Sequence, residues 1–366
     1  MSFEDGWAAI HLETPPRVPR TEYSAEGHWE LIRAVTGFDV TPESPSDQRQ
    51  AASIAFQKAW NMDFFWCTLV AGQVFGSLKT DMGHAEYAAG GVDRRDTISC
   101  PFREPEDVLS FDPAAAYGLR DPSDWTAREP FGTAGYETVV KAFEKHYSEN
   151  CRVRPFGVNM TGVYVTLMSG LIEIFGWDMM LLAAGTDPKA FGELMNRYAA
   201  WVRRYFDALA DSDVPVVMIH DDMVWTSGAF LHPDWYRTYL FPNLKKLLTP
   251  LREAGKVIAF TCDGNYTEFI DDVADAGVSG FVMEPTTDMA YIAEKYGKTH
   301  FFIGNADTRI LLMGTKAQIR AEVERCMAVG KHCPGFFMAV GNHIPANTPV
   351  ENCLYYNEVY EELARR

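Results

Sequence analysis

Residues 257–264 read V-I-A-F-T-C-D-G, a short run of strand-forming residues that ends on a thiol and a carboxylate. Four other segments between residues 214 and 341 have the same character. They are V-P-V-V-M-I-H (214–220), G-F-V-M-E (280–284), H-F-F-I-G (300–304) and G-F-F-M-A-V-G (335–341). Each is continuously apolar, as expected for a strand of a parallel sheet that helices cover on both faces.

Helices are indicated between these five strands and before them. Asp187 and Pro188 have the residue types of a helix cap and first turn, and an apolar helical face follows them. Capping boxes are indicated at 315–318 and 348–351, and an apolar helix is expected over 163–184. A further candidate strand, R-P-F-G-V-N-M, occupies residues 154–160.

This alternation decides the fold class. Five consecutive strand–helix units, with room for three more upstream, favour a (β/α)8 TIM barrel over a doubly wound sheet. No glycine-rich GxGxxG loop follows a strand, which weakens the nucleotide-binding alternative. We expect one barrel domain over residues 1–366. Its regular units occupy 154–366, whereas 1–150 form a less regular N-terminal helical and loop extension and the first barrel units.

Composition limits the partners. The formal net charge of −17 argues against nucleic acid and anionic membrane surfaces. The seven cysteines are widely spaced without a CxxC pair, which suits free thiols in a reducing compartment. The N-terminus lacks a basic region followed by an apolar stretch, and no apolar run is long enough to span a bilayer. We therefore expect a cytoplasmic protein.

Polar residues gather where the predicted strands end. These residues are His220, Asp221, Asp222, Thr261, Cys262, Asp263, Glu284, Asn305, Asp307, Asn342 and His343. Because the chemistry of TIM barrels lies at the C-terminal ends of the strands, we expect these groups to meet at one mouth. Each also has a simpler explanation: Asp and Asn after a strand cap the next helix, and a lone cysteine is usually an inert buried thiol.

Several of these segments resemble the uroporphyrinogen decarboxylase superfamily. They are H-D-D-M-V-W-T-S-G (220–228), H-P-D-W-Y-R-T-Y-L-F-P (232–242), C-D-G-N (262–265), G-N-A-D-T-R-I-L-L (304–312) and N-H-I-P-A-N-T-P-V-E-N (342–352). The resemblance is dense from 154 to 366, and it makes P-R-V-P-R-T-E-Y (16–23) the first barrel strand. It implies either decarboxylation of a tetrapyrrole or methyl transfer to a corrinoid, and some of the methyltransferases use zinc or demethylate methoxylated aromatics.

The decarboxylase branch is the less favoured of the two. Its substrate carries many carboxylates, and the arginine-bearing RQAGR-like segment of that branch is absent near the N-terminus. Arg20, Arg94 and Arg95 would have to replace it, in a strongly acidic chain.

The zinc-dependent branch has a His-x-Cys pattern on one strand and a further Cys in the last barrel strand. Cys262 falls on the first Cys, but Phe260 and Asn342 occupy the other two positions. We therefore expect a remodelled zinc site with three protein ligands and one open position. Its expected ligands are Cys262, His343 and a carboxylate from Glu284 or Asp222.

Other roles are expected from residue type and position. The expected catalytic residues are His220, Asp221 and Asp222, although Asp221 equally suits a helix cap. The expected substrate-binding residues are His84, Glu86, Tyr164, Trp225 and Asn305. The aromatic-rich stretch W-N-M-D-F-F-W-C (60–67) is a further candidate for the wall of a substrate pocket, although most aromatic residues of a barrel fill its core. His84 and Glu86 interrupt apolar sequence, which is costly to bury unless they contact something.

The resemblance and these residues together predict a demethylating methyltransferase. It would transfer a methyl group from a small methoxylated compound, most simply an aromatic methyl ether, to the cobalt of a separate corrinoid protein. This chain has no D-x-H-x-x-G signature, so the corrinoid would come from a partner or as a free cofactor. Two alternatives stay open: a metal-independent decarboxylase with Asp222 as acid–base group, and a barrel that only binds a ligand or corrinoid protein.

Overall fold

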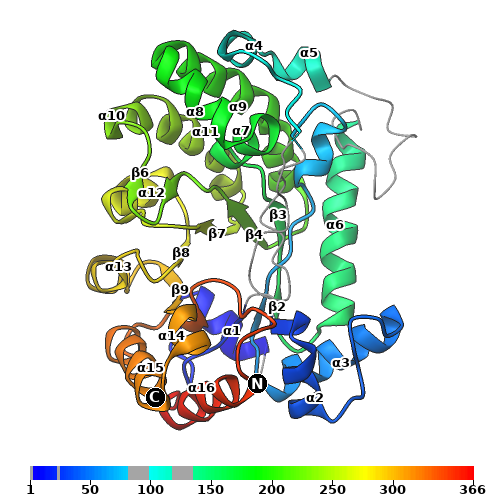
Figure 1. The fold of residues 1–366 in the computed structure, drawn as a ribbon, viewed down its shortest axis with the longest axis vertical. Coiled ribbons are helices and arrows are strands. Elements are labelled where there is room, and N and C mark those ends of the chain that lie inside the picture. Colours follow the sequence, from blue (N-terminus) through cyan, green and yellow to red (C-terminus); the bar gives the residue numbers. More distant parts are fainter. Residues whose placement is uncertain (1–2, 23–24, 81–98, 118–134) are drawn as a thin grey trace.

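A parallel sheet surrounded by helices forms the body of the molecule. The computed structural model describes residues 3–22, 25–80, 99–117 and 135–366 (Figure 1). Six strands lie in the spatial order β10–β9–β8–β7–β4–β3, all parallel. They are β3 (Thr161–Val163), β4 (Val216–His220), β7 (Val257–Cys262), β8 (Gly280–Met283), β9 (Phe301–Ala306) and β10 (Phe336–Val340). The five strands expected between 214 and 341 are all present.

Shorter pairings close this sheet into a barrel. β1 (Phe64–Phe65) pairs with β2 (Val158–Asn159), and one residue separates β2 from β3. Arg20 bridges Met338 of β10 on one side, and its carbonyl accepts a hydrogen bond of 2.8 Å from Asp63 N on the other. The segment around Arg20 is therefore the first barrel strand, and the (β/α)8 barrel is confirmed.

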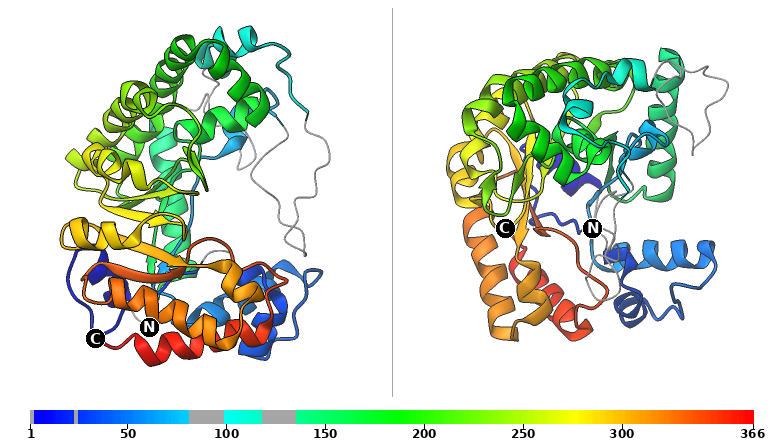
Figure 2. Two further views of the ribbon diagram at one scale, coloured as in Figure 1. Left: turned by 60° about the vertical axis from the view of Figure 1, so that its left-hand side comes forward. Right: turned by 45° about the horizontal axis from the view of Figure 1, so that its top comes forward.

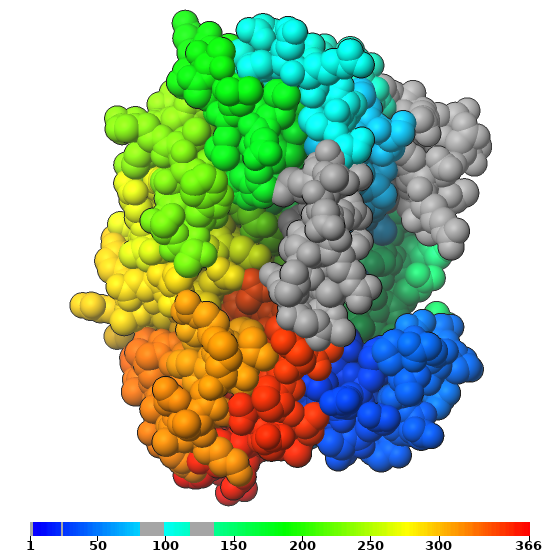
Figure 3. Space-filling model, viewed as in Figure 1, coloured from blue at the N-terminus to red at the C-terminus, as the bar shows by residue number. Residues whose placement is uncertain are grey.

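Helices cover the outside of the strands (Figure 2). From residue 135 onward the longer ones are α6 (Tyr136–Val153), α7 (Met168–Phe175), α8 (Trp177–Thr186), α9 (Pro188–Asp211), α11 (Phe241–Glu253), α12 (Ile270–Ala276), α13 (Met289–Tyr296), α15 (Lys316–Gly330) and α16 (Val350–Leu363). The N-terminal part contributes α1 (Phe3–Ile10), α2 (Trp29–Thr36) and α3 (Ser46–Ala59). In Figure 3 the blue N-terminal segment lies beside red α16, where α2 packs against that helix.

The helix starts test the predicted caps. Asp187 accepts hydrogen bonds from Lys189 N and Ala190 N, and the capping box at 315–318 is formed. The prediction of a capping box at 348–351 is wrong, because Pro349 occupies the cap position and has no side-chain acceptor. The helix expected over 163–184 is two helices, α7 and α8, with a bend of 111° between them. No single helix in the described part of the chain is long and apolar enough to cross a membrane.

Alternate residues of each strand face opposite ways, and this decides which side chains reach the mouth. One buried cluster takes inward-facing residues from the strands, among them Met218 of β4 and Ala259 of β7. The intervening residues, such as Ile219, Phe260 and Cys262, belong to a second buried cluster and pack against the helices. Successive side chains of a strand point to opposite faces. Every second residue counted from an inward-facing one therefore also faces inward, and this holds for the residues at the end of each strand.

Candidate active site

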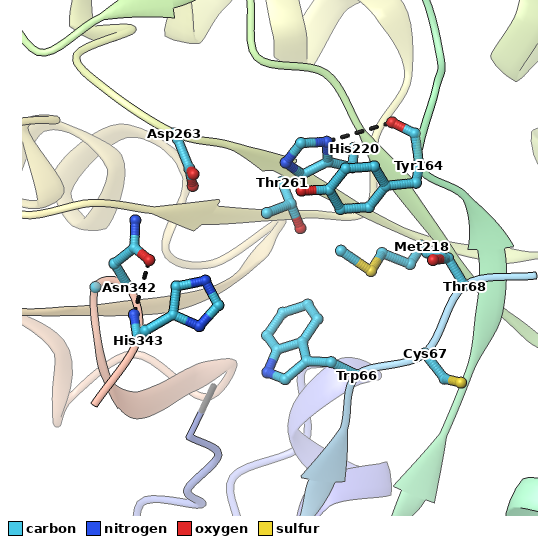
Figure 4. Close-up of a pocket in the computed structure, with 11 residues that line it drawn as sticks. Trp66, Cys67, Thr68, Tyr164, Met218, His220, Thr261, Asp263, Asn342 and His343 are labelled. Carbon is cyan, nitrogen blue, oxygen red and sulfur yellow. Dashed lines mark hydrogen bonds between the residues drawn. The ribbon is translucent and has the colours of Figure 1, made fainter. Parts of the chain in front are cut away.

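A cavity of about 220 Å³ lies at the C-terminal ends of the strands (Figure 4). Its described lining residues are Trp66, Cys67, Thr68, Tyr164, Met218, His220, Thr261, Asp263, Gly341, Asn342 and His343. They come from the ends of β1, β3, β4, β7 and β10, so five strands contribute to one mouth. This position is where TIM barrels place their chemistry.

One acid–histidine group, comprising His220, Asp222 and Asp263, lies beside this cavity. The Nε2 atom of His220 is 3.2 Å from Asp222 Oδ1. The same carboxylate oxygen accepts a hydrogen bond of 3.0 Å from Asp263 N. One ligand atom from each of the three residues lies within 4.8 Å of the others. Adjacent strands β4 and β7 bring the group together, since His220 ends one and Asp263 follows the other.

The imidazole of His220 is held by its neighbours. The ring of Tyr164 stacks on it with centroids 3.8 Å apart and planes 10° apart, as Figure 4 shows. The Nδ1 atom lies 3.3 Å from the Tyr164 carbonyl and 3.3 Å from Ser169 Oγ. These contacts fix the ring so that Nε2 faces the carboxylates.

Burial and charge shift the pKa values of the group. Burial lowers the pKa of His220, but the adjacent Asp222 carboxylate outweighs it and raises the value to about 9. Burial, with Asp222 as the next cause, raises the pKa of Asp263 to about 8. Without a bound cation, the group therefore holds protons at neutral pH.

Glu284 supports the mouth from behind the cavity wall. Its Oε2 atom accepts a hydrogen bond of 2.7 Å from Gly264 N, and Oε1 accepts one from Asn342 Nδ2. Asn342 Oδ1 accepts from His343 N at 2.7 Å. The side chain of Glu284 thereby ties the loop after β7 to the loop after β10. His343 lines the cavity, and burial lowers its pKa.

The expected zinc ligands Cys262, His343 and Glu284 do not come together, because Cys262 faces away. Its side chain is 1% exposed within the outer cluster, and Sγ donates to the carbonyl of Asp263 at 3.2 Å. Burial raises the pKa of this thiol well above its usual value. A His-x-Cys pattern needs two side chains on one face, and in β7 the pair that faces the cavity is Thr261 and Asp263. The sequence placement was one residue out of register.

Three further expected site residues lie outside the cavity wall. Asp221 faces outward and accepts from Leu167 N at 3.1 Å and Ser169 N at 2.8 Å, so it has the capping role that the sequence left open. Asn305 is buried and donates to the carbonyls of Glu284 and Thr287. Trp225 is 44% exposed and packs on Trp177 and Phe230. Burial is also what raises the pKa of Asp221 to about 7.

Of the remaining expectations, Tyr164 lies in the cavity wall. His84, Glu86, Arg94 and Arg95 lie outside the described residues. Trp66 and Cys67 line the cavity at the end of β1 and belong to the aromatic-rich stretch 60–67 that was a candidate pocket wall. Thr68 lines the cavity beside them, and no role was predicted for it from the sequence. The strand they follow is two residues long, so no periodicity marked it. No sequence signal in β7 separates Thr261 and Asp263 from Cys262, because both faces of this strand are buried.

Known proteins are similar to this chain in sequence and in fold. The uroporphyrinogen decarboxylase (URO-D) family model matches residues 113–363. The uroporphyrinogen decarboxylase of Carboxydothermus hydrogenoformans is 31% identical over 180 residues, 48% of this chain and 49% of the relative. One from Thermus thermophilus is 29% identical over 171 residues, 47% and 48% of the two chains. The matches thus span about half the length of these curated relatives.

A solved structure resembles the chain over nearly its whole length. A methyltransferase from Methanosarcina mazei has a TM-score of 0.64 and 18% sequence identity, with 98% of each chain covered. At this identity the likeness shows a shared fold and nothing finer. The family model covers more than half of the sequence, and the barrel has the architecture expected of its members. The chain belongs to the uroporphyrinogen decarboxylase family.

Proposed function

We propose that this protein is a methyltransferase that takes a methyl group from a small methoxylated compound and passes it to the cobalt of a corrinoid partner protein. One observation carries the proposal: the small cavity has aromatic walls and ends on the acid–histidine group. Trp66 and Tyr164 form walls that suit an aromatic ring, while His220 and Asp263 offer polar contacts to an ether oxygen. An aromatic methyl ether is therefore the preferred donor.

The similarity to decarboxylases makes a metal-independent decarboxylase the second candidate. A substrate with several carboxylates needs cationic partners. Among the described lining residues there is no lysine or arginine, and Asp263 adds a carboxylate. Arg20 is fully buried and paired with Glu22. The described wall therefore favours a neutral or phenolic ether over a polyanion.

The acid–histidine group fits a divalent cation such as zinc. One imidazole nitrogen and two carboxylate oxygens within 4.8 Å form a common donor set for zinc. The negative charge near Asp263, to which Asp222 and Glu284 both contribute, is part of what raises its pKa. A cation held by His220, Asp222 and Asp263 would act as a Lewis acid toward the ether oxygen and make it a better leaving group.

The chain's own residues orient the donor. Trp66 and Tyr164 hold the ring, and the stacked Tyr164 also keeps the His220 imidazole in place. Thr261 is buried, and its oxygen points into the cavity in Figure 4 without a hydrogen-bond partner among the described residues. A polar substituent of the bound compound would complete its hydrogen bonding.

A methyl-transfer assay tests the function. A panel of methoxybenzenes incubated with the protein and reduced cobalamin, used in place of the partner, is expected to produce the absorbance of methylcobalamin. The control omits the protein. Carbon dioxide release from aromatic carboxylic acids, with no methylcobalamin from any ether, would establish the decarboxylase instead.

Zinc binding is expected to weaken as the pH falls. Zinc must displace the protons that His220 and Asp263 hold, whose pKa values are raised to about 9 and about 8. Between about pH 8 and about pH 6 each displaced proton lowers the apparent affinity about tenfold per pH unit. Competition with a chelator across this range measures the slope. An affinity independent of pH would contradict the assignment of these ligands.

Metal analysis of tag-free protein supplies the control for this titration. We expect about one zinc per chain in the wild type and in Cys262→Ala, and none in His220→Ala. Zinc lost from Cys262→Ala but retained in His220→Ala would restore the ligand set that the sequence suggested.

A further inference from the structure

A cysteine–histidine–threonine relay, comprising Cys67, His146 and Thr161, lies at another part of the cavity wall. The Sγ atom of Cys67 is 3.3 Å from His146 Nε2, and His146 Nδ1 is 2.7 Å from Thr161 Oγ1. Cys67 follows β1, His146 lies on α6 and Thr161 begins β3. Cys67 lines the cavity, away from Asp263 in Figure 4, and the methyl-transfer proposal assigns it no role.

These contacts have the order of a nucleophile, a base and a group that orients the base. When the Cys67 thiol donates to Nε2, the proton on Nδ1 faces Thr161 Oγ1, which fixes the imidazole tautomer. This is the arrangement that allows a thiol to lose its proton as it attacks.

Other side chains on α6 favour the thiolate once it forms. Asn150 hydrogen-bonds to Cys67, and the positive charge of Arg154 at the end of the helix acts on the thiol. With His146 they occupy positions i, i+4 and i+8, which lie on one helical face. Glu149 is the charged group that acts on His146.

Burial keeps the resting pair neutral. It raises the pKa of Cys67 and lowers the pKa of His146. The thiolate therefore forms only when His146 accepts the proton during a reaction, and reactivity of Cys67 depends on that base. An alkylating agent that releases a halide would react with this thiol without returning the proton, whereas a disulfide uses His146 both as acceptor and as donor.

We propose that Cys67 is a modification site that undergoes exchange with small aliphatic disulfides entering the cavity, with His146 as its base. The thiol proton passes to His146 Nε2 and the sulfur attacks one sulfur of the disulfide. The S–S bond of the small molecule breaks, and its second sulfur leaves as a thiolate that takes the proton back from His146. Cys67 is left in a mixed disulfide, and no further oxidant is needed.

The cavity itself supports a ligand of this size. Its volume is about 220 Å³, and the buried hydroxyl of Thr261 points into it without a partner among the described residues. Such a polar atom is normally satisfied by a protein group, a water or a ligand. The inference does not depend on methyl transfer, because it concerns only the chemistry of the Cys67 sulfur.

The test is the rate of modification by 2-hydroxyethyl disulfide, followed by intact mass and peptide mapping. Cys100 and Cys151 are half-buried like Cys67 and serve as internal references in the same wild-type protein. We expect Cys67 to react at least about tenfold faster than either, and His146→Gln to slow it by about a hundredfold. Equal rates at Cys67 and Cys151, or a rate at Cys67 unaffected by His146→Gln, would overturn the proposal.

Two variants separate the base from a general effect on α6. Ser148→Ala changes an exposed residue of the same helix and should leave the rate at Cys67 unchanged. Thr161→Val keeps the shape of the side chain but removes the oxygen that orients His146, so we expect about a tenfold loss. If His146→Gln does not fold, the wild-type comparison and Thr161→Val still decide the outcome.

Discussion

Asp263→Asn is expected to lower kcat/KM for methyl transfer about a thousandfold. Asp263 lines the cavity, belongs to the acid–histidine group and would supply one of its three ligand atoms. The amide has nearly the same shape but lacks the charge that holds a cation. Because the lost interaction acts on the departing oxygen, the loss should be mainly in kcat. Initial rates of methylcobalamin formation at varied ether concentration measure the two constants.

The fold is expected to survive this substitution. The pKa of Asp263 is raised to about 8 in the folded protein, so the fold disfavours the ionised carboxylate relative to the neutral acid. That destabilisation is absent below the ordinary Asp pKa of 3.8, grows as the pH rises from there to about 8, and is constant above pH 8. Above pH 8 a neutral amide should therefore leave the melting temperature unchanged or raise it. A large fall in melting temperature would mean that lost activity reflects unfolding.

Cys262→Ala is the matched control, one residue before Asp263 at the end of β7. Its side chain faces the helix layer, so we expect kcat/KM to stay within about twofold of the wild-type value. Full activity in Asp263→Asn with loss in Cys262→Ala would show that the wrong face of β7 has been assigned to the mouth. The two variants together thus test the register of the site.

The fold could be predicted from the sequence because its signals are local. Continuous apolar runs marked β4 and β7 to β10, and Asp187 marked the start of α9. The first barrel strands could not be predicted in the same way. β1 is two residues long, and the segment around Arg20 makes a single bridge to β10. Their pairing depends on residues far along the chain, which no local pattern encodes.

The site could be located from the sequence, but its facing residues could not. In a strand buried on both sides every residue is apolar, so hydrophobic periodicity does not tell which positions face inward. Polar residues occur only at the end of β7, and there the residue types favoured Cys262 over Thr261 and Asp263 as a zinc ligand. His220 could be proposed as a site residue without knowing which face of its strand points inward, because two carboxylates follow it directly in the sequence. Trp66 and Cys67 belong to a stretch that the sequence marked as aromatic, but only the tertiary structure places these two residues in the cavity wall.

Glu22→Ala is expected to lower the free energy of unfolding by about 3–5 kcal/mol, because it leaves a buried arginine without its counter-ion. Glu22 Oε1 accepts from Arg20 Nε at 3.0 Å, and neither side chain is exposed. Glu22 also accepts from Val340 N at 2.9 Å and Tyr356 OH at 2.8 Å. The carboxylate thus joins the first barrel strand to β10 and α16. Equilibrium unfolding in urea measures the loss.

The aromatic surroundings of Arg20 make the charge, and not packing alone, the cause of this loss. The guanidinium lies over the rings of Trp60, Tyr356 and Tyr360 with centroids 4.3, 5.0 and 4.7 Å away. These rings stabilise a cation but exclude the water that would otherwise solvate it once Glu22 is gone. Adding Arg20→Met to Glu22→Ala removes the stranded charge and should restore part of the stability, as seen when buried ion pairs are replaced by apolar groups.

An exposed ion pair provides the comparison that decides between charge burial and simple loss of a salt bridge. Arg320 and Glu362 form a pair with a distance of 2.6 Å on the surface of α15 and α16. Solvent already screens both groups, so Glu362→Ala should leave the urea midpoint unchanged. If Glu22→Ala also left the urea midpoint unchanged, Arg20 would have to be solvated in the folded protein. The contact between the first barrel strand and β10 would then not depend on this ion pair.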